Sequence, residues 1–247
     1  MTASALEGKL AHYDSQAGWT RSLRAYLYRL AEIGTRERAL DVGCGGGWLT
    51  AELHAKVKHG ATGCDIDEDI LTVARRAHSG PEFVVSRPAR LPFADDTFDL
   101  CCCHFTLLWA TEPVALLAEM KRVSRPGAIV LVMAEPDWGG YLEWPDLGLG
   151  PRIAAALATQ GADPLAGRQL RAWLVEAGLT IRELGITAGP WPADENAIDA
   201  AWRHHRWTLA DLVEERTLRV LERQARRAWA EGVRTVHLPL AWAAVEV

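Results

Sequence analysis

Short apolar runs alternate with segments of helical spacing through the first 135 residues of the chain. The runs cover residues 39–42, 61–64, 83–85, 100–103 and 129–134. Segments with apolar residues three and four positions apart lie between them, at 49–57, 70–77 and 114–123. Unbroken apolar runs are typical of strands covered on both faces, and connections long enough to hold a helix join parallel strands by right-handed crossovers. The alternation predicts a doubly wound α/β sheet.

Two further strands are expected later in the chain, at residues 179–187 and 236–247, with a helix at 170–177 before them. The last strand would complete the sheet as a hairpin partner. The prediction is a Rossmann-like, seven-stranded, mostly parallel sheet with an antiparallel last strand. Between these strands, apolar residues at helical spacing predict an inserted pair of helices over 194–232.

The segments that flank the sheet are less regular. A helix with one apolar face runs up to Gly34, which we expect to be its C-cap. Residues 135–150 are rich in glycine, proline and aromatic residues and are expected to be irregular. A chain of 247 residues fits one hydrophobic core. We expect a single domain over 1–247, with a helical cap at 1–34, a ligand-binding core at 35–135 and a candidate lid at 194–232.

Charge and hydropathy exclude several classes of partner. The formal net charge is -5, and cationic side chains are interspersed with acidic ones, so nucleic acid is not expected to bind. The first 14 residues lack the apolar core of a signal peptide. No stretch has the ~18 unbroken apolar residues that span a bilayer. We therefore expect a cytoplasmic protein without a membrane partner.

The five cysteines all fall in or beside predicted strands. They are Cys44, Cys64, Cys101, Cys102 and Cys103. Three in a row cannot close one tetrahedral metal site, because alternate strand residues point to opposite faces. We expect reduced core residues and no metal site.

A glycine-rich segment, LDVGCGGG at residues 40–47, stands where the first strand turns into the first helix. Glycine allows a tight bend and a close approach of the backbone to a ligand. Amides at a helix N-terminus attract anions, whether phosphate or carboxylate. Glycine-rich loops also make plain turns, so this loop by itself leaves a cofactor site and a structural turn both open.

An acidic residue, Asp65, ends the second predicted strand, twenty positions after Gly45. A carboxylate there can accept hydrogen bonds from both hydroxyls of a ribose and would repel a 2′-phosphate. The alternative role is a helix N-cap, which suits Asp67 better because Asp67 directly precedes the helix. Loop and acid together favour a nucleoside-containing cofactor.

A dinucleotide fingerprint requires a third glycine three positions after the second one. Counted from Gly43, that position holds Trp48, whose ring would oppose close packing of helix on strand. The pattern therefore disfavours a nicotinamide-dependent oxidoreductase, which we keep as the third and least favoured hypothesis for the function.

Four sequence blocks resemble the class I S-adenosylmethionine-dependent methyltransferases, in the branch of ubiquinone and menaquinone biosynthesis and small-molecule methylation. The blocks are LDVGCGGG at 40–47, GCDIDEDIL at 63–71, ARLPFADDTFDLCCCHFTLLW at 89–109 and KRVSRPGAIVLV at 121–132. The resemblance implies an enzyme that transfers a methyl group from S-adenosylmethionine to oxygen, nitrogen or carbon of a small-molecule acceptor. The second hypothesis is a binding protein of the same fold that transfers nothing.

The resemblance also implies roles for individual residues. The methionine part of the cofactor would be surrounded by Asp41, Gly43, Cys44, Gly45 and Gly47. Asp65 would hold the ribose, Ile66 would pack on adenine, the backbone at Cys103 and His104 would face the methionine end, and Tyr13 would close over the site. The family often has an Asp-Ala pair where this chain has Arg87-Pro88. Because arginine cannot accept the adenine amino hydrogen bond, backbone groups near Pro88 and Ala89, or stacking by Arg87, would replace it.

The acceptor is expected beyond the carboxyl ends of the strands. The residues expected to gather there are Trp109, Glu135, Asp137, Trp138 and Tyr141, with Trp202, His204 and His205 either facing the site or forming the core of the lid. Transfer from a sulfonium mainly needs alignment, so a base is optional. His104 is the candidate base, and its alternative is a hydrogen-bonded structural group. The sequence indicates neither the acceptor's identity nor the oligomeric state.

Overall fold

The structure, a computed structural model, describes residues 8, 10, 13, 16–87, 90–188 and 195–247. A seven-stranded sheet with the order β3-β2-β1-β4-β5-β9-β7 forms its centre. The strands are β1 Ala39–Val42, β2 Ala61–Asp65, β3 Glu82–Val85, β4 Phe98–Cys103, β5 Ser124–Pro136, β7 Thr180–Ala188 and β9 Pro239–Glu246. The pairs from β3 to β5 are parallel, whereas β9 runs antiparallel to both β5 and β7. The predicted fold class is confirmed.

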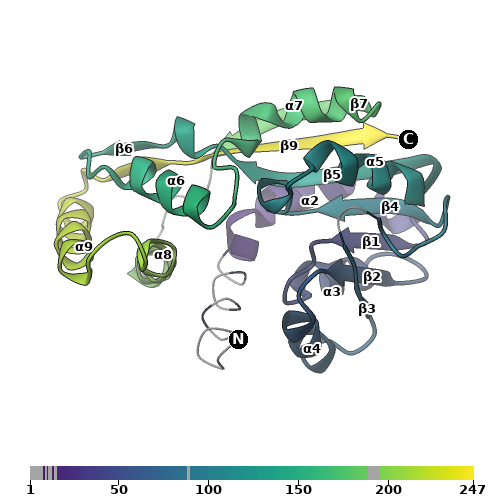
Figure 1. Cartoon of the computed structure of the whole chain (residues 1–247), viewed down its shortest axis with the longest axis horizontal. Helices are drawn as coiled ribbons and strands as arrows, with labels where there is room; N and C mark the ends of the chain where they lie inside the picture. The colour runs from purple at the N-terminus through teal and green to yellow at the C-terminus, as the bar shows by residue number, and fades with distance from the viewer. Residues whose placement is uncertain (1–7, 9, 11–12, 14–15, 88–89, 189–194) are drawn as a thin grey trace.

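Helices cover both faces of this sheet (Figure 1). They are α2 Arg21–Leu30, α3 Trp48–His54, α4 Glu68–Ala77, α5 Pro113–Val123 and α7 Ala166–Glu176. Apolar residues of α5 and α7 pack on one face with Cys101 and Cys103, and those of α2 and α3 pack on the other face with Cys102. The three cysteines therefore alternate between faces, as the strand period requires. All five cysteines are buried and free, as predicted for core residues.

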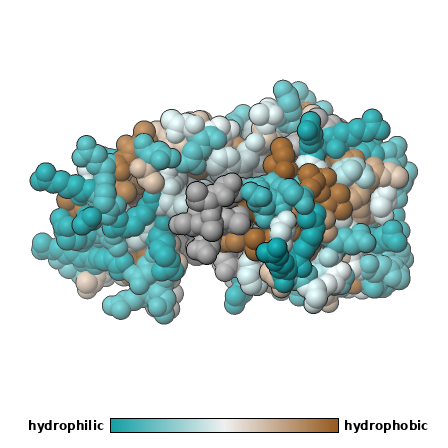
Figure 2. All heavy atoms as spheres, turned by 60° about the horizontal axis from the view of Figure 1, so that its bottom comes forward, coloured by the Kyte–Doolittle hydropathy of each residue, from teal (hydrophilic) through white to brown (hydrophobic). Residues whose placement is uncertain are grey.

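A second layer of helices lies at the end of the molecule remote from α3 and α4 (Figure 1). It consists of α6 Leu149–Thr159, α8 Glu195–Leu209 and α9 Glu215–Ala230, with the ribbon of β6 Leu142–Trp144 and β8 Thr235–His237. These helices share a core of their own. The buried Arg234 of the ribbon segment donates to Glu143 at 2.6 Å. The outer surface over α8 and α9 is mostly hydrophilic (Figure 2).

Three details differ from the sequence predictions. The helix α2 ends at Leu30 with Ala31 as its C-cap, and Glu32 has a φ of 50°, so Gly34 is not the cap but lies in a short 3₁₀ helix, Ile33–Thr35. Residues 135–150 are more regular than expected, since they hold the end of β5, a 3₁₀ turn at Trp138–Gly140 and β6. The helix α6 was not predicted. The segment 149–159 is rich in alanine, and a helix of mostly small residues carries a weak amphipathic signal in its sequence.

Among the described residues, every helix is too short or too polar to cross a bilayer. The insertion predicted at 194–232 does form two helices, α8 and α9. Its role as a lid, and the single-domain organisation, stay predictions.

Candidate active site

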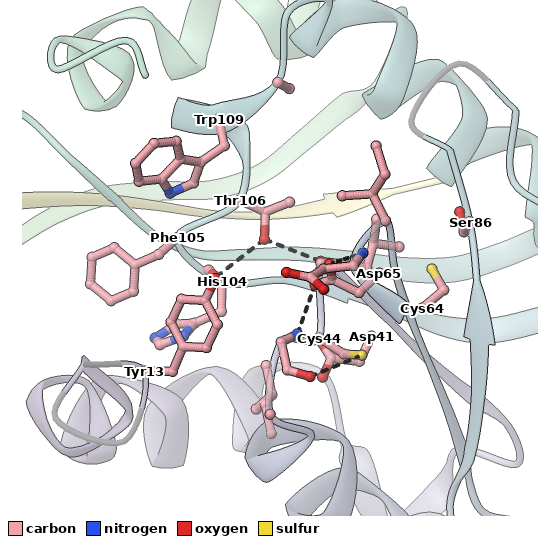
Figure 3. A pocket seen from close by; sticks show the side chains of 18 of the residues that line it. Tyr13, Asp41, Cys44, Cys64, Asp65, Ser86, His104, Phe105, Thr106 and Trp109 are labelled. Carbon is pink, nitrogen blue, oxygen red and sulfur yellow. Dashed lines mark hydrogen bonds between the residues drawn. The ribbon is translucent and has the colours of Figure 1, made fainter. Parts of the chain in front are cut away.

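A cavity of about 620 Å³ opens at the carboxyl ends of the parallel strands. It is lined by the turn after β1, the end of β2, the segment after β4 and described residues of the N-terminal segment, including Tyr13 (Figure 3). Open α/β sheets bind ligands at this edge, and a volume in this range suits a small ligand.

The turn after β1 depends on glycines at positive φ. Gly43 has a φ of 73°, and a Cβ there would lie 2.5 Å from Thr106 Cγ2. Gly45 has a φ of 49°, and a Cβ there would lie 2.9 Å from the ring of Tyr13. A larger residue at either position would therefore be disfavoured for two reasons, the strain of a positive φ and the clash of its Cβ with Thr106 or Tyr13. At these two positions the backbone packs directly on Thr106 and Tyr13, both of which line the cavity.

Most amides of this turn are used within the protein. Gly43 and Cys44 donate to the carbonyl of Cys64 at 2.8 and 3.0 Å. The amide of Gly45 donates to Asp65 Oδ2 at 2.9 Å. Asp65 thus positions the glycine turn directly, which sequence reasoning did not predict.

Asp65 keeps acceptor capacity for a ligand. A carboxylate has about four lone-pair sites. Two of these accept from the amides of Gly45 and Asp67, the latter through Oδ1 at 3.0 Å. The N-cap of α4 is Asp67, whose side chain accepts from Asp69 and Ile70, so the N-cap role predicted for Asp67 is confirmed. The ribose-binding role of Asp65 stays a prediction.

Asp41 is a buried support beneath the turn. Its Oδ2 accepts from Thr50 Oγ1 at 2.7 Å, and the side chain is almost inaccessible to solvent. Burial raises the pKa of Asp41 to about 7, although the hydrogen bond from Thr50 opposes this shift. Asp41 joins the start of α3 to the end of β1.

Trp48 does not obstruct the packing of helix on strand. Its side chain is 50% exposed, and its ring meets the edge of His78 with centroids 4.9 Å apart. The close approach occurs instead at Gly47, where a Cβ would lie 2.7 Å from Phe83 and 3.1 Å from Ala74. The prediction that the Trp48 ring opposes close packing of helix on strand is therefore wrong, because the turn places a glycine, Gly47, at the point of close approach.

Eight of the predicted cofactor residues line the cavity: Tyr13, Asp41, Gly43, Cys44, Gly45, Asp65, Ile66 and His104. Gly47 and Cys103 do not line it, since Gly47 packs on Phe83 and Cys103 is buried in the sheet core. Pro88 and Ala89 fall outside the described residues. Ser86 and Thr106 also line the cavity and were missed, although each lies just past a predicted strand end, which was the available signal.

His104 is held by the N-terminal part of the chain. Its Nε2 lies 2.8 Å from Thr20 Oγ1, and that hydroxyl accepts from Arg24 Nη1 at 2.7 Å. The guanidinium can only donate, so the Thr20 oxygen accepts from Arg24 and the hydroxyl hydrogen stays available for His104 Nε2. Burial lowers the pKa of His104 to about 3. The geometry therefore favours His104 as a hydrogen-bonded structural group over His104 as a base.

Glu135 supports the cavity wall without facing the cavity. Its Oε1 accepts from the amides of Thr106 and Leu107 at 3.0 and 2.9 Å, and its Oε2 accepts from Leu108 at 3.0 Å. The side chain is fully buried, and burial raises the pKa of Glu135 to about 7. It orients the 3₁₀ turn Leu107–Trp109, from which Trp109 reaches the cavity.

The other residues predicted for the acceptor end do not gather there. Asp137 caps the turn at Gly139 and pairs with Arg168, and Trp138 and Tyr141 pack in the core of the second layer. Trp202 is buried in that core too, as its alternative role predicted, and His204 and His205 are likewise absent from the cavity lining. Trp207 from α8 and Gln160 after α6 line the cavity instead. Apolar residues at helical spacing look the same whether they face a core or a cavity, so the sequence did not identify Trp207 and Gln160 as lining residues.

Comparison with known proteins identifies the family. A family model described as a methyltransferase domain matches residues 40–132. An uncharacterized methyltransferase of Schizosaccharomyces pombe is 30% identical over 190 residues, covering 70% of this chain and 67% of that protein. A malonyl-[acyl-carrier protein] O-methyltransferase of Serratia marcescens is 29% identical over 129 residues, 52% of this chain and 50% of that protein. A demethylmenaquinone methyltransferase of Paenarthrobacter aurescens is 30% identical over 164 residues, covering 63% of this chain and 64% of that protein. The chain thus spans between half and two thirds of the length of these relatives.

A solved structure extends the likeness of the fold to most of the chain. A protein of Bacillus halodurans C-125, provisionally assigned as a methyltransferase, matches with a TM-score of 0.64 at 18% identity, covering 90% of this chain and 97% of that one. At this identity the match concerns the fold alone. The sequence relatives and the matched domain lead to one assignment. The chain belongs to the class I S-adenosylmethionine-dependent methyltransferases.

Proposed function

We propose that the cavity binds S-adenosylmethionine and that the chain transfers its methyl group to oxygen, nitrogen or carbon of a small-molecule acceptor. The observation that carries this proposal is the position of Asp65 against the glycine turn, in a cavity that continues past His104 to Trp109. The two remaining acceptor sites of the Asp65 carboxylate match the two hydroxyls of one ribose.

The rest of the cofactor can be assigned along the cavity. Ile66, which is 65% exposed, offers an apolar surface for adenine beside the ribose. The methionine part would lie along Gly43 and Gly45 toward His104, with the ring of Tyr13 covering Gly45. The glycines of the turn let Thr106 and Tyr13 pack directly on its backbone, and both of these side chains line the same cavity.

S-adenosylmethionine supplies a methyl group on a sulfonium, and its transfer needs in-line alignment more than acid–base help. The chain's part is to hold both partners in that alignment. Thr106, whose hydroxyl donates to the carbonyl of Val42 at 3.1 Å, fixes the wall between the two ends of the cavity. His104 contributes a neutral, hydrogen-bonded surface there.

Isothermal titration of the purified chain with S-adenosylhomocysteine tests the binding step. Asp65→Ala removes two hydrogen bonds to a charged acceptor, each worth about 1.5–3 kcal/mol. The expected loss of affinity is at least about a hundredfold. The matched control is Asp69→Ala, an exposed carboxylate on α4 that does not line the cavity, and it should bind as the wild type does.

Unchanged affinity in Asp65→Ala, with the urea midpoint retained, would place the ribose elsewhere. NAD should give no heat in the same titration. A panel of acceptors incubated with S-adenosylmethionine then separates an enzyme from a binding protein of the same fold. Binding without formation of S-adenosylhomocysteine for any acceptor would favour the non-catalytic alternative.

A further inference from the structure

Charge is distributed unevenly along the cavity. The carboxylates that line it are Asp41, Asp65 and Asp67, which stand at the ends of β1 and β2 or just after them. In the described part of the chain, neither lysine nor arginine lines the cavity. Figure 3 shows the division, with Asp41 and Asp65 on one side of Thr106 and Phe105 and Trp109 on the other. We call the part of the cavity lined by Phe105, Trp109, Gln160 and Trp207 the far end. Among the described residues, the far end offers no ionised side chain to a ligand.

Three of the four residues that define the far end are aromatic. Trp109 comes from the 3₁₀ turn held by Glu135, and it keeps 40% of its surface exposed. Trp207 comes from α8. Phe105 follows β4 and contacts the edge of the His104 ring, with centroids 4.6 Å apart. Tryptophan and phenylalanine bind flat apolar groups by burial and by ring contact.

One polar group at the far end has a settled orientation. Gln160 Nε2 donates to the carbonyl oxygen of Thr208 at 3.2 Å. A carbonyl oxygen only accepts, so the amide nitrogen must face it and Oε1 is the atom left for a ligand. The far end thus presents a neutral hydrogen-bond acceptor among aromatic rings.

We propose that the methyl acceptor is an uncharged aromatic molecule whose ring lies against Trp109 and Trp207 and whose hydroxyl or N–H donates to Gln160 Oε1. This rests on the function proposed above and narrows its substrate class. A carboxylate or an ammonium group at the far end would lose water without gaining a partner, which disfavours both. In the transfer, the bond from the acceptor atom to the methyl carbon forms as the carbon–sulfur bond breaks. The electron pair goes to sulfur, and the acceptor's proton leaves to water, since His104 Nε2 is already engaged with Thr20.

Three probes that differ in one group test the charge preference. They are 2-naphthol, 2-naphthoate and 2-naphthylmethylammonium, titrated at pH 7 into protein saturated with S-adenosylhomocysteine. We expect 2-naphthol to bind at least tenfold more tightly than either charged probe. Equal or tighter binding of 2-naphthoate, or no binding of 2-naphthol, would overturn the proposal.

A charge placed at Gln160 provides a gain-of-function test. Gln160→Lys adds a cation at the C-terminal end of α6, where a helix tolerates it well, and should raise the affinity for 2-naphthoate at least tenfold. Gln160→Met is the matched control, because it removes the amide without adding charge, and should weaken 2-naphthol without favouring 2-naphthoate. Identical probe preferences in the two variants would overturn the proposal.

Each variant is first titrated with S-adenosylhomocysteine alone. Failure of that step in the wild type contradicts the proposed function. Failure of the probes with intact S-adenosylhomocysteine binding contradicts the proposed acceptor class only.

Discussion

Two glycines with nearly the same φ allow the free-energy cost of overpacking to be measured separately from the cost of a left-handed backbone. Gly47 has a φ of 82° and Gly127 a φ of 79°. A Cβ on Gly127 would meet nothing within 4 Å, whereas one on Gly47 would lie 2.7 Å from two ring atoms of Phe83. Left-handed backbone costs a non-glycine residue about 1–2 kcal/mol. Overpacking of a filled core costs a further ~1–3 kcal/mol.

Gly127→Ala should therefore lower the free energy of unfolding by about 1–2 kcal/mol and Gly47→Ala by about 2–5 kcal/mol. The difference corresponds to roughly 2–12 °C in melting temperature for a chain of this size. Urea denaturation followed by circular dichroism measures both variants. If Gly47→Ala is no less stable than Gly127→Ala, helix α3 does not approach β3 as described, and the account of the glycine turn is wrong.

Two other substitutions test the supports beneath the cavity. Glu135→Gln keeps an acceptor for Thr106 and Leu107 but turns an amide N–H₂ toward the amide of Leu108, so it should lower the free energy of unfolding in urea by about 1–3 kcal/mol. The control, Glu176→Gln, changes an exposed side chain and should alter the free energy of unfolding by no more than about 0.5 kcal/mol. Equal stability of the two variants would contradict the role of Glu135 as a buried acceptor for these amides. The pKa of Asp41 is raised to about 7 in the folded state, so its contribution to stability is present below its unfolded pKa near 4 and is lost as the pH rises through about 7. Asp41→Asn removes this titration and should gain stability relative to the wild type, by up to about 4 kcal/mol, between pH 4 and pH 8; parallel pH profiles would show that the buried carboxyl does not titrate as described.

Sequence predicted the sheet well because its signals are local. Each buried strand is an unbroken apolar run, and the first predicted run, 39–42, coincides with β1. The N-cap at Asp67 was also predictable, since a carboxylate just before a helix has free amides within reach. The unpredicted α6 shows the limit of this reasoning, because a helix of small residues is identified by what packs on it rather than by its own pattern.

The candidate site divides in the same way. Gly45 and Asp65 were named together from their spacing, and the structure joins them by a hydrogen bond, whereas their roles toward a cofactor stay predictions. Glu135 and Gln160 show what spacing could not supply. One was expected in the cavity and is buried under a turn, and the other was not considered and lines the far end.

The amino-acid sequence by itself determined which segments become strands and where the backbone must bend, because burial periodicity and the sterics of positive φ act within a few residues. The tertiary structure alone decided which polar and aromatic side chains face the cavity. That choice depends on elements far apart in the chain, such as Trp109 after β4 and Trp207 on α8, meeting at one end of the sheet. A side chain on either element can be satisfied by core or by cavity, and only the packing of its neighbours determines which one it meets.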